Sequence, residues 1–130
     1  MKIIGNGVDI VENKRIQKSI QNNKFLERIF TKKEINKSIK KKNKVNYFAK
    51  RFAAKEAFVK AIGIGFRNDI NFNDIEILNN NQGKPYISIS KKLKKYLKKK
   101  LNLEKYKIFL SLSDESKFSI AFVILNSNSK

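Results

Sequence analysis

A row of small residues constrains this chain more than any other sequence feature. Alanines recur at every fourth position within residues 46–62: Ala49, Ala53, Ala57 and Ala61. This spacing predicts one long helix with a continuous stripe of small side chains, along which another backbone can approach closely. Gly63 follows directly, as is typical of a helix C-terminus. We therefore expect a central helix with a close-packed partner along its alanine face.

Shorter strand and helix patterns surround this helix. We expect strands at residues 3–11, 72–78, 85–89, 106–112 and 118–125, and helices at residues 13–20, 25–30, 31–42 and 91–101. Thr31 followed by Glu34 forms a capping box. Strands and helices mix without a strict βαβ rhythm, so the predicted class is α+β, a small antiparallel sheet with a long central helix. Residues 1–126 are expected to form one domain, and residues 127–130 a disordered tail.

The composition excludes several kinds of chemistry. The chain has no cysteine and no histidine, which excludes disulfides, thiolate nucleophiles, a histidine base and a histidine-ligated zinc site. No run approaches the roughly 18 apolar residues of a membrane span, and the N-terminus lacks a signal-peptide pattern. We expect a cytoplasmic protein with no membrane partner.

The net charge of +19, from 30 basic and 11 acidic residues, favours an anionic partner. Lysine far exceeds arginine, and a lysine surface rich in Asn and Ile is also typical of an AT-rich genome. A nucleic-acid-binding module without catalysis would explain the charge. Proteins that read bases and phosphates favour arginine forks, however, and only four arginines occur. We expect no nucleic-acid partner.

Asp9 is the first candidate for chemistry. It follows Gly5 and Gly7 in the first predicted strand, where glycine implies close backbone approach. A carboxylate at the end of such a strand suits a hard cation such as Mg²⁺, which prefers oxygen ligands. The alternative is that Asp9 caps the helix that follows.

Glu56 and Lys60 are the second candidates. They are four residues apart on the long helix and so share a face. A plain surface ion pair is the alternative. Phe52 and Val59 lie on the same face, however, and charged groups flanked by buried apolar groups favour a cleft. The last predicted hairpin, around residues 111–125, has no spacing of its own that demands catalysis.

Together these segments resemble the short bacterial holo-acyl-carrier-protein synthases, which are phosphopantetheinyl transferases. The family pattern Gly-x-Gly-x-Asp-x-x-Glu is present at residues 5–12 and is followed by Arg15. The hallmark Arg-Phe-Ala-Ala-Lys-Glu-Ala-Phe-x-Lys-Ala is intact at residues 51–61, and residues 73–87 match the strand, turn and Gly-Lys-Pro return. One position departs: the family's Ser-x-[Ser/Thr]-His is Ser-Leu-Ser-Asp here, ending at Asp114.

The resemblance implies a mechanism. Asp9 and Glu56 would hold magnesium on the pyrophosphate of coenzyme A, and a serine of apo acyl carrier protein would attack the β-phosphate. Adenosine 3',5'-bisphosphate would leave, with Lys60 balancing or protonating its phosphate. Because no histidine is present, we expect Glu56 to act as the base through a metal-bound water. A relative that has lost activity is the alternative that Asp114 suggests.

The resemblance also implies partners. We expect a homotrimer with coenzyme A in clefts between subunits. The expected coenzyme A contacts are Arg51, Lys55, Gly63, Gly65, Lys84 and Ser113. The expected docking residues for the acidic carrier protein are Lys14, Arg15, Lys18 and Lys24. For Asp114 we favour an ion pair with a lysine such as Lys117 over a place in the metal shell.

Overall fold

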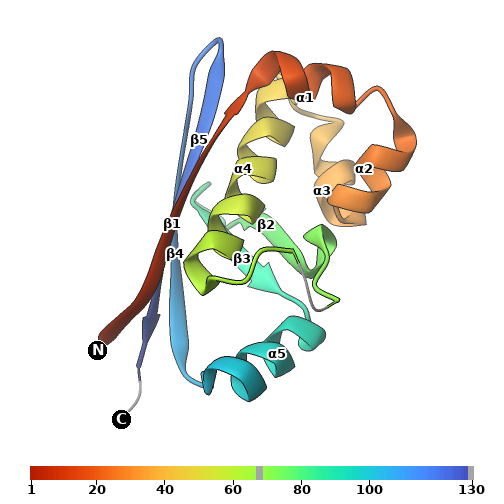
Figure 1. Cartoon of the computed structure of the whole chain (residues 1–130). Helices are drawn as coiled ribbons and strands as arrows, with labels where there is room; N and C mark the ends of the chain where they lie inside the picture. The colour runs from red at the N-terminus through yellow and green to blue at the C-terminus, as the bar shows by residue number, and fades with distance from the viewer. Residues whose placement is uncertain (67–68, 129–130) are drawn as a thin grey trace.

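The long helix lies at the centre of the molecule, between a three-stranded sheet and a group of short helices (Figure 1). The computed structural model describes residues 1–66 and 69–128. Its elements are β1 (Lys2–Glu12), α1 (Asn13–Ser19), α2 (Asn23–Ile29), α3 (Lys32–Ser38), α4 (Lys44–Ile62), the 3₁₀ turn η1 (Phe72–Asp74), β2 (Ile75–Asn79), β3 (Pro85–Ile89), α5 (Lys91–Leu101), β4 (Tyr106–Asp114) and β5 (Phe118–Ser127). This arrangement confirms the α+β class and the long central helix.

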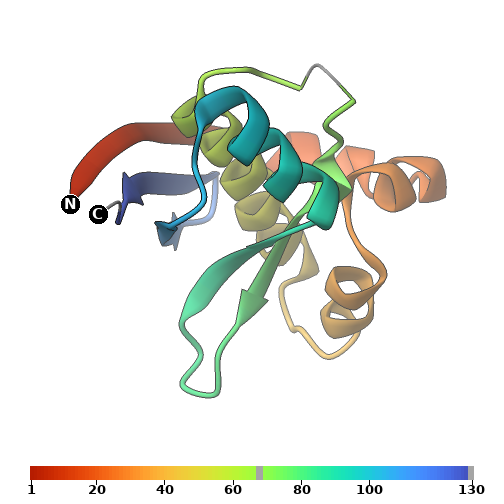
Figure 2. The ribbon, with the colours of Figure 1, turned by 90° about the horizontal axis from the view of Figure 1, so that it is seen from below.

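Two separate antiparallel sheets flank α4. The larger has the strand order β1-β5-β4, and the smaller is the hairpin β2-β3. Figure 2 shows this hairpin projecting from the body of the molecule, with α5 crossing near its base. None of the helices within residues 1–66 and 69–128 is long and apolar enough to cross a membrane.

The close-packed partner of the alanine stripe is β1. A Cβ atom added at Gly7 would lie 1.9 Å from the carbonyl oxygen of Ala57, and one added at Gly5 would lie 2.1 Å from that of Ala61. Real Cβ atoms do not approach oxygen so closely, so only glycine fits at these two positions of β1, against the backbone of α4. This contact fixes the height of β1 along the helix, and therefore the position of Asp9.

A buried ion pair ties α3 to the middle of α4. Lys55 Nζ lies 2.7 Å from Glu34 Oε1, and both side chains have no exposed surface. The same ammonium donates to the carbonyl oxygens of Ile29 at 2.8 Å and Phe72 at 3.2 Å. Glu34 also accepts from the backbone N–H of Ile77 at 2.7 Å. All these partners satisfy charges that would otherwise be costly to bury.

Several element boundaries differ from those expected, and three of these differences have a clear structural cause. Helix α3 was expected to run to about residue 42 but ends at Ser38. There the Ser38 hydroxyl donates to the carbonyl oxygen of Ile35. The expected strand at 72–78 starts at Ile75, because Asp74 accepts from Asn71 N–H and shapes a 3₁₀ turn. Strand β5 continues to Ser127, inside the expected tail, because it pairs with Lys2 in β1. Residues 129 and 130 lie outside the described residues.

Candidate functional site

Asp9 and Lys60 meet where β1 passes α4. Lys60 Nζ lies 3.1 Å from Asp9 Oδ1 and donates to the carbonyl oxygen of Val8 at 3.0 Å. The Asp9 side chain is only 15% exposed, whereas that of Lys60 is 55% exposed. Helix α1 has Glu12 at its N-cap position, without a side-chain capping bond. Asp9 therefore does not cap this helix, and its carboxylate faces α4.

Glu56 completes the group. Burial raises the pKa of its carboxyl group, and the negative charge of Asp9 raises it further, while Lys60 and Arg15 act in the opposite direction. Asp9 raises the pKa of Glu56 because the two carboxylates lie close together, so they belong to one site. The ion pair of Lys60 is with Asp9, so the simple Glu56–Lys60 surface pair is not what the helix forms.

The donor set of this group suits a hard divalent cation. Two partly buried carboxylates facing one another, with one pKa already raised by the other, would be relieved by a positive ion between them. Across residues 1–66 and 69–128, no cluster of three or more acidic, histidine or cysteine side chains could hold a metal. Asp9 and Glu56 are the two carboxylates of this group, whereas Asp114 lines the separate basic pocket.

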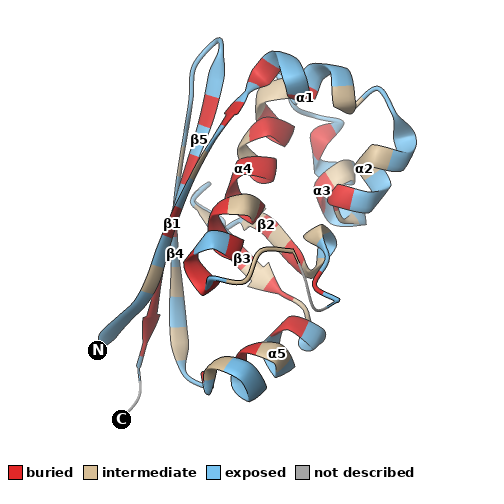
Figure 3. Cartoon of the chain, viewed as in Figure 1, coloured by how far each residue is buried: buried red, intermediate tan, exposed pale blue. Residues whose placement is uncertain are grey.

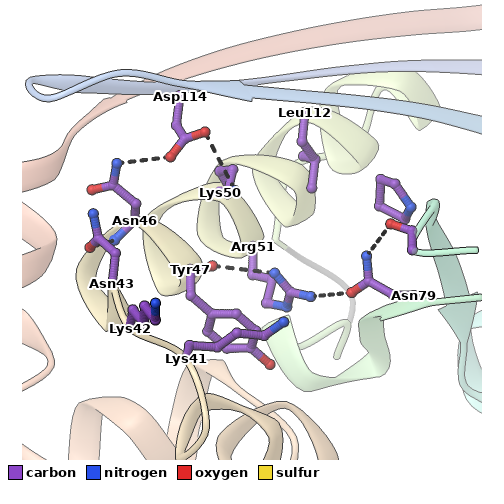
Figure 4. Close-up of a pocket in the computed structure, with 12 residues that line it drawn as sticks. Lys41, Lys42, Asn43, Asn46, Tyr47, Lys50, Arg51, Asn79, Leu112 and Asp114 are labelled. Atoms are coloured by element: carbon purple, nitrogen blue, oxygen red, sulfur yellow. Dashed lines mark hydrogen bonds and ion pairs between the residues drawn. The ribbon is translucent and has the colours of Figure 1, made fainter.

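A second feature is a basic pocket of about 390 Å³ beside the first half of α4 (Figure 4). Its lining combines cations, amides, one tyrosine and one carboxylate: Lys41, Lys42, Asn43, Asn46, Tyr47, Lys50, Arg51, Asn79, Gly83, Pro85, Leu112 and Asp114. A neighbouring hollow of about 420 Å³ shares Arg51 and adds Lys37 and Lys40. Clustered cations of this kind attract a phosphorylated ligand.

Arg51 is the fixed centre of the pocket. Its guanidinium lies 3.8 Å from the Tyr47 ring centre, and Nη2 donates to Asn79 Oδ1 at 2.7 Å. Burial lowers the pKa of Arg51, which is only 4% exposed. Its Nε has no partner among the described residues. A planar guanidinium held in this way beside a cluster of lysines is suited to recognising an anion.

The structure separates the residues expected to bind coenzyme A. Arg51 lines the pocket. Lys84 and Ser113 are exposed and adjoin lining residues without lining the pocket themselves. Gly63 ends α4 with a φ of 78°, and Gly65 follows with a φ of 67°. These two glycines lie at the opposite end of the helix from the pocket.

The expectation for Lys55 is wrong. It was expected to contact coenzyme A, but its side chain is fully buried in the ion pair with Glu34. A lysine whose three donors are already taken by Glu34, Ile29 and Phe72 has none left for a ligand. Its role in this chain is to hold α3 against α4.

Asp114 pairs with a lysine, as favoured, but not with Lys117. Its Oδ1 lies 3.4 Å from Lys50 Nζ, and its Oδ2 accepts from Asn46 Nδ2 at 2.8 Å. The end of β4 passes the first turns of α4, which brings Asp114 into the basic pocket (Figure 4). No spacing within the hairpin could reveal this partner.

Sequence reasoning missed most of the pocket. The residues at the start of α4 that line it are the N-cap residue Asn43 and Asn46, Tyr47, Lys50 and Arg51. These positions follow the i, i+3, i+4, i+7 spacing of a helical face. That spacing was the sequence signal that could have revealed this side of the pocket. Lys41 and Lys42, which precede α4 in the chain, also line the pocket.

The expected docking residues are all exposed. Lys14, Arg15 and Lys18 lie on α1, and Lys24 lies at the start of α2. Arg15 is close enough to Glu56 to lower its pKa, so this basic face adjoins the carboxylate pair.

The outer face of the three-stranded sheet is apolar and uncovered. Figure 3 shows exposed residues along β1 and β5. Val8 pairs across the strands with Phe122, and Ile10 with Ile120. Val8 and Ile10 are 54% and 58% exposed, and Phe122 is 40% exposed. Single exposed apolar residues are ordinary, but a paired row of them indicates an interaction face.

Comparison with known proteins gives a consistent result. The profile of the 4'-phosphopantetheinyl transferase superfamily matches residues 5–123. A holo-[acyl-carrier-protein] synthase of Pelagibacter ubique is 52% identical over 125 residues, covering 96% of this chain and 98% of the relative. The crystal structure of the synthase from Neisseria meningitidis is 38% identical, with a TM-score of 0.87, over 96% of this chain and 99% of that one.

A second solved structure contains a ligand. The holo-(acyl-carrier-protein) synthase from Bacillus anthracis in complex with CoA (3',5'-ADP) is 36% identical, with a TM-score of 0.81, over 98% of this chain and 100% of that one. The fold is that of the holo-[acyl-carrier-protein] synthases, and the carboxylate pair lies within the family's matched residues. The chain belongs to the 4'-phosphopantetheinyl transferase superfamily.

Proposed function

We propose that this chain is a holo-[acyl-carrier-protein] synthase. It transfers the 4'-phosphopantetheine group of coenzyme A to a serine of apo acyl carrier protein and releases adenosine 3',5'-bisphosphate, in support of fatty acid biosynthesis. The observation that carries the proposal is the grouping of Asp9, Glu56 and Lys60, within a chain similar to synthases of that name over nearly its whole length. Coenzyme A and acyl carrier protein are its expected partners.

Asp9 and Glu56 would hold magnesium, which when bound supplies positive charge against the pyrophosphate of coenzyme A. Glu56 is assigned the role of base for the proton of the carrier serine, acting through a water molecule; burial and the negative charge of Asp9 raise its pKa, which makes its carboxylate a better proton acceptor. The serine oxygen forms a bond to the β-phosphorus, and the bond from that phosphorus to the bridging oxygen breaks. Lys60 is placed to offset the charge that grows on the leaving phosphate.

The basic pocket around Arg51 is the place for the phosphorylated adenosine end of coenzyme A. Arg51 turns toward Asn79 in the β2-β3 hairpin, while Glu56 faces Asp9 on β1. Arg51 and Glu56 are five positions apart in the helix, so their side chains point about 140° apart around its axis. The basic pocket and the carboxylate pair therefore face different directions in one chain. A coenzyme A molecule that bridges two copies would meet the pocket of one and the carboxylates of the other.

The apolar outer face of the sheet supports self-association. Valine, isoleucine and phenylalanine side chains of β1 and β5 form a row that a second copy could cover. We propose a homotrimer in the cytoplasm, with its coenzyme A sites between subunits. The exposed cations of α1 would then meet the acidic carrier protein beside the carboxylates, where they raise the rate of association.

The rival function, a nucleic-acid-binding module, has less support. It accounts for the charge of +19 but not for the partly buried carboxylate pair or the extent of the family match. A single assay separates the two. Incubation with coenzyme A, Mg²⁺ and an apo carrier protein should increase the mass of the carrier by one phosphopantetheine group, as intact mass spectrometry shows.

Two controls belong to the assay: a chelator, and a carrier whose target serine is alanine. Both should abolish the mass increase. An unmodified wild-type carrier under conditions where an established synthase modifies it would contradict the proposed function.

A further inference from the structure

The basic pocket contains its own negative charge. Four cations line it, Lys41, Lys42, Lys50 and Arg51, and the one carboxylate among its lining residues is Asp114. A pocket that served only to hold an anion would gain nothing from this carboxylate, because it repels the ligand and neutralises a lysine. The role of Asp114 therefore needs its own explanation.

Asp114 is bound from both sides. One carboxylate oxygen accepts from Asn46 Nδ2 at 2.8 Å, and the other lies 3.4 Å from Lys50 Nζ. The side chains of Asp114 and Lys50 are 31% and 28% exposed, so water screens the pair only in part. The pair joins the end of β4 to α4 beside the other residues that line the pocket (Figure 4).

The backbone that bears Asp114 is fixed independently of Lys50. Asn13 is 4% exposed, and its amide donates to the carbonyl oxygens of Glu115 at 2.8 Å and Ser116 at 3.2 Å. Asn46 Nδ2 also donates to the Glu115 carbonyl at 3.1 Å. Lys50, on a long flexible side chain, can turn to a ligand, whereas the hairpin holds Asp114 in place.

We propose that Asp114 is a permanent counter-charge that weakens phosphate binding in this pocket and so favours release of the nucleotide product. A phosphate that enters must share Lys50 with Asp114 and remain near a fixed negative charge. The cations still attract it, but it leaves sooner than it would from a pocket of cations alone. The inference rests on the proposed function, because it assumes that a phosphorylated nucleotide uses this pocket.

Titration calorimetry with adenosine 3',5'-bisphosphate tests the inference on the full chain. Asp114→Asn keeps the size and shape of the side chain and one acceptor oxygen for Asn46, and removes the negative charge. It should tighten nucleotide binding roughly three- to tenfold at low salt, an effect that shrinks as salt screens the charges. Affinity for uncharged adenosine should not change. A merely structural role for Asp114 would alter both ligands alike.

Three further variants extend the test. Glu115→Gln removes a charge from the same hairpin outside the pocket and should leave nucleotide affinity unchanged. In a Lys50→Met background, the gain from Asp114→Asn should be smaller, because part of it comes from freeing Lys50. Asp114→Ser provides a second neutral variant should the asparagine variant fold poorly, and should also tighten binding.

The outcomes distinguish a failure of the counter-charge role from a failure of the nucleotide-pocket assignment on which it rests. If wild type and neutral variants bind the nucleotide with equal affinity, or the neutral variants bind more weakly, the counter-charge role is wrong while the nucleotide pocket stands. If neither wild type nor the neutral variants bind the nucleotide, the pocket assignment and the inference are both overturned.

Discussion

Lys55 and Glu34 form an ion pair in the core, with 2.7 Å between Lys55 Nζ and Glu34 Oε1 and no exposed surface on either side chain. The next residue along α4, Glu56, belongs to the candidate catalytic group. One helix thus uses adjacent charged residues for opposite purposes, one for packing and the other for chemistry.

Lys55→Met should destabilise the fold by about 3–5 kcal/mol, because it leaves the Glu34 carboxylate buried without its counter-ion. Urea unfolding followed by circular dichroism measures the change. Lys99→Met, at an exposed position on α5, should change stability by less than about 0.5 kcal/mol. Equal stability of the Lys55 variant and wild type would show that the pair contributes nothing.

Gly7→Ala should lower the free energy of unfolding by about 1–3 kcal/mol. The added methyl group would meet the carbonyl oxygen of Ala57 at 1.9 Å, so β1 and α4 must move apart. Thermal melts of this variant and of Asn6→Ala, at a neighbouring exposed position, measure the effect. A Gly7 variant that melts with the Asn6 variant would mean that β1 packs less closely than described.

The raised pKa of Glu56 predicts a pH dependence of stability in metal-free protein. A carboxyl group whose folded pKa is raised contributes stability below its unfolded value, near the ordinary 4.5, and loses it as pH rises through the folded value. Relative to Glu56→Gln, wild type in chelator should therefore lose stability as pH rises from about 4.5. Denaturant titrations across that range measure it, and parallel curves for the two proteins would contradict the shift.

Lys60→Ala should lower kcat by on the order of 10²-fold and change KM little, because the charge that Lys60 offsets grows as the phosphate leaves. Steady-state transfer kinetics with coenzyme A varied separate the two constants. Lys99→Ala serves as a matched control for net charge. A raised KM with normal kcat would make Lys60 a ground-state contact.

Phe122→Glu should weaken self-association, because it places a charge in the apolar outer row of the sheet. Light scattering coupled to size-exclusion chromatography should show wild type as an oligomer and this variant as monomer. Ile39→Glu is the matched control, since Ile39 is 67% exposed and follows α3, away from the sheet. If both variants keep the oligomeric state of wild type, the interface lies elsewhere.

Local patterns of the sequence determined the elements and the family. The alanine spacing predicted α4 and its close-packed partner, the Thr31 and Glu34 capping box predicted the start of α3, and alternating apolar residues predicted the strands. The motif around Asp9 and Glu56 identified the residues of the candidate site. The helix, cap and strand signals each lie within a few neighbouring residues, so local periodicity reveals them, whereas the site residues came from the resemblance of two separated motifs to a known family.

Only the tertiary structure decided which charges are buried and which face a ligand. Lys55 and Lys60 are both lysines of α4, but a carboxylate from α3 meets the first and β1 meets the second. Asp114 likewise found its partner in Lys50, 64 residues earlier in the chain. Such pairings depend on how distant elements pack, and the energy of a charge depends on its surroundings rather than on its neighbours in sequence.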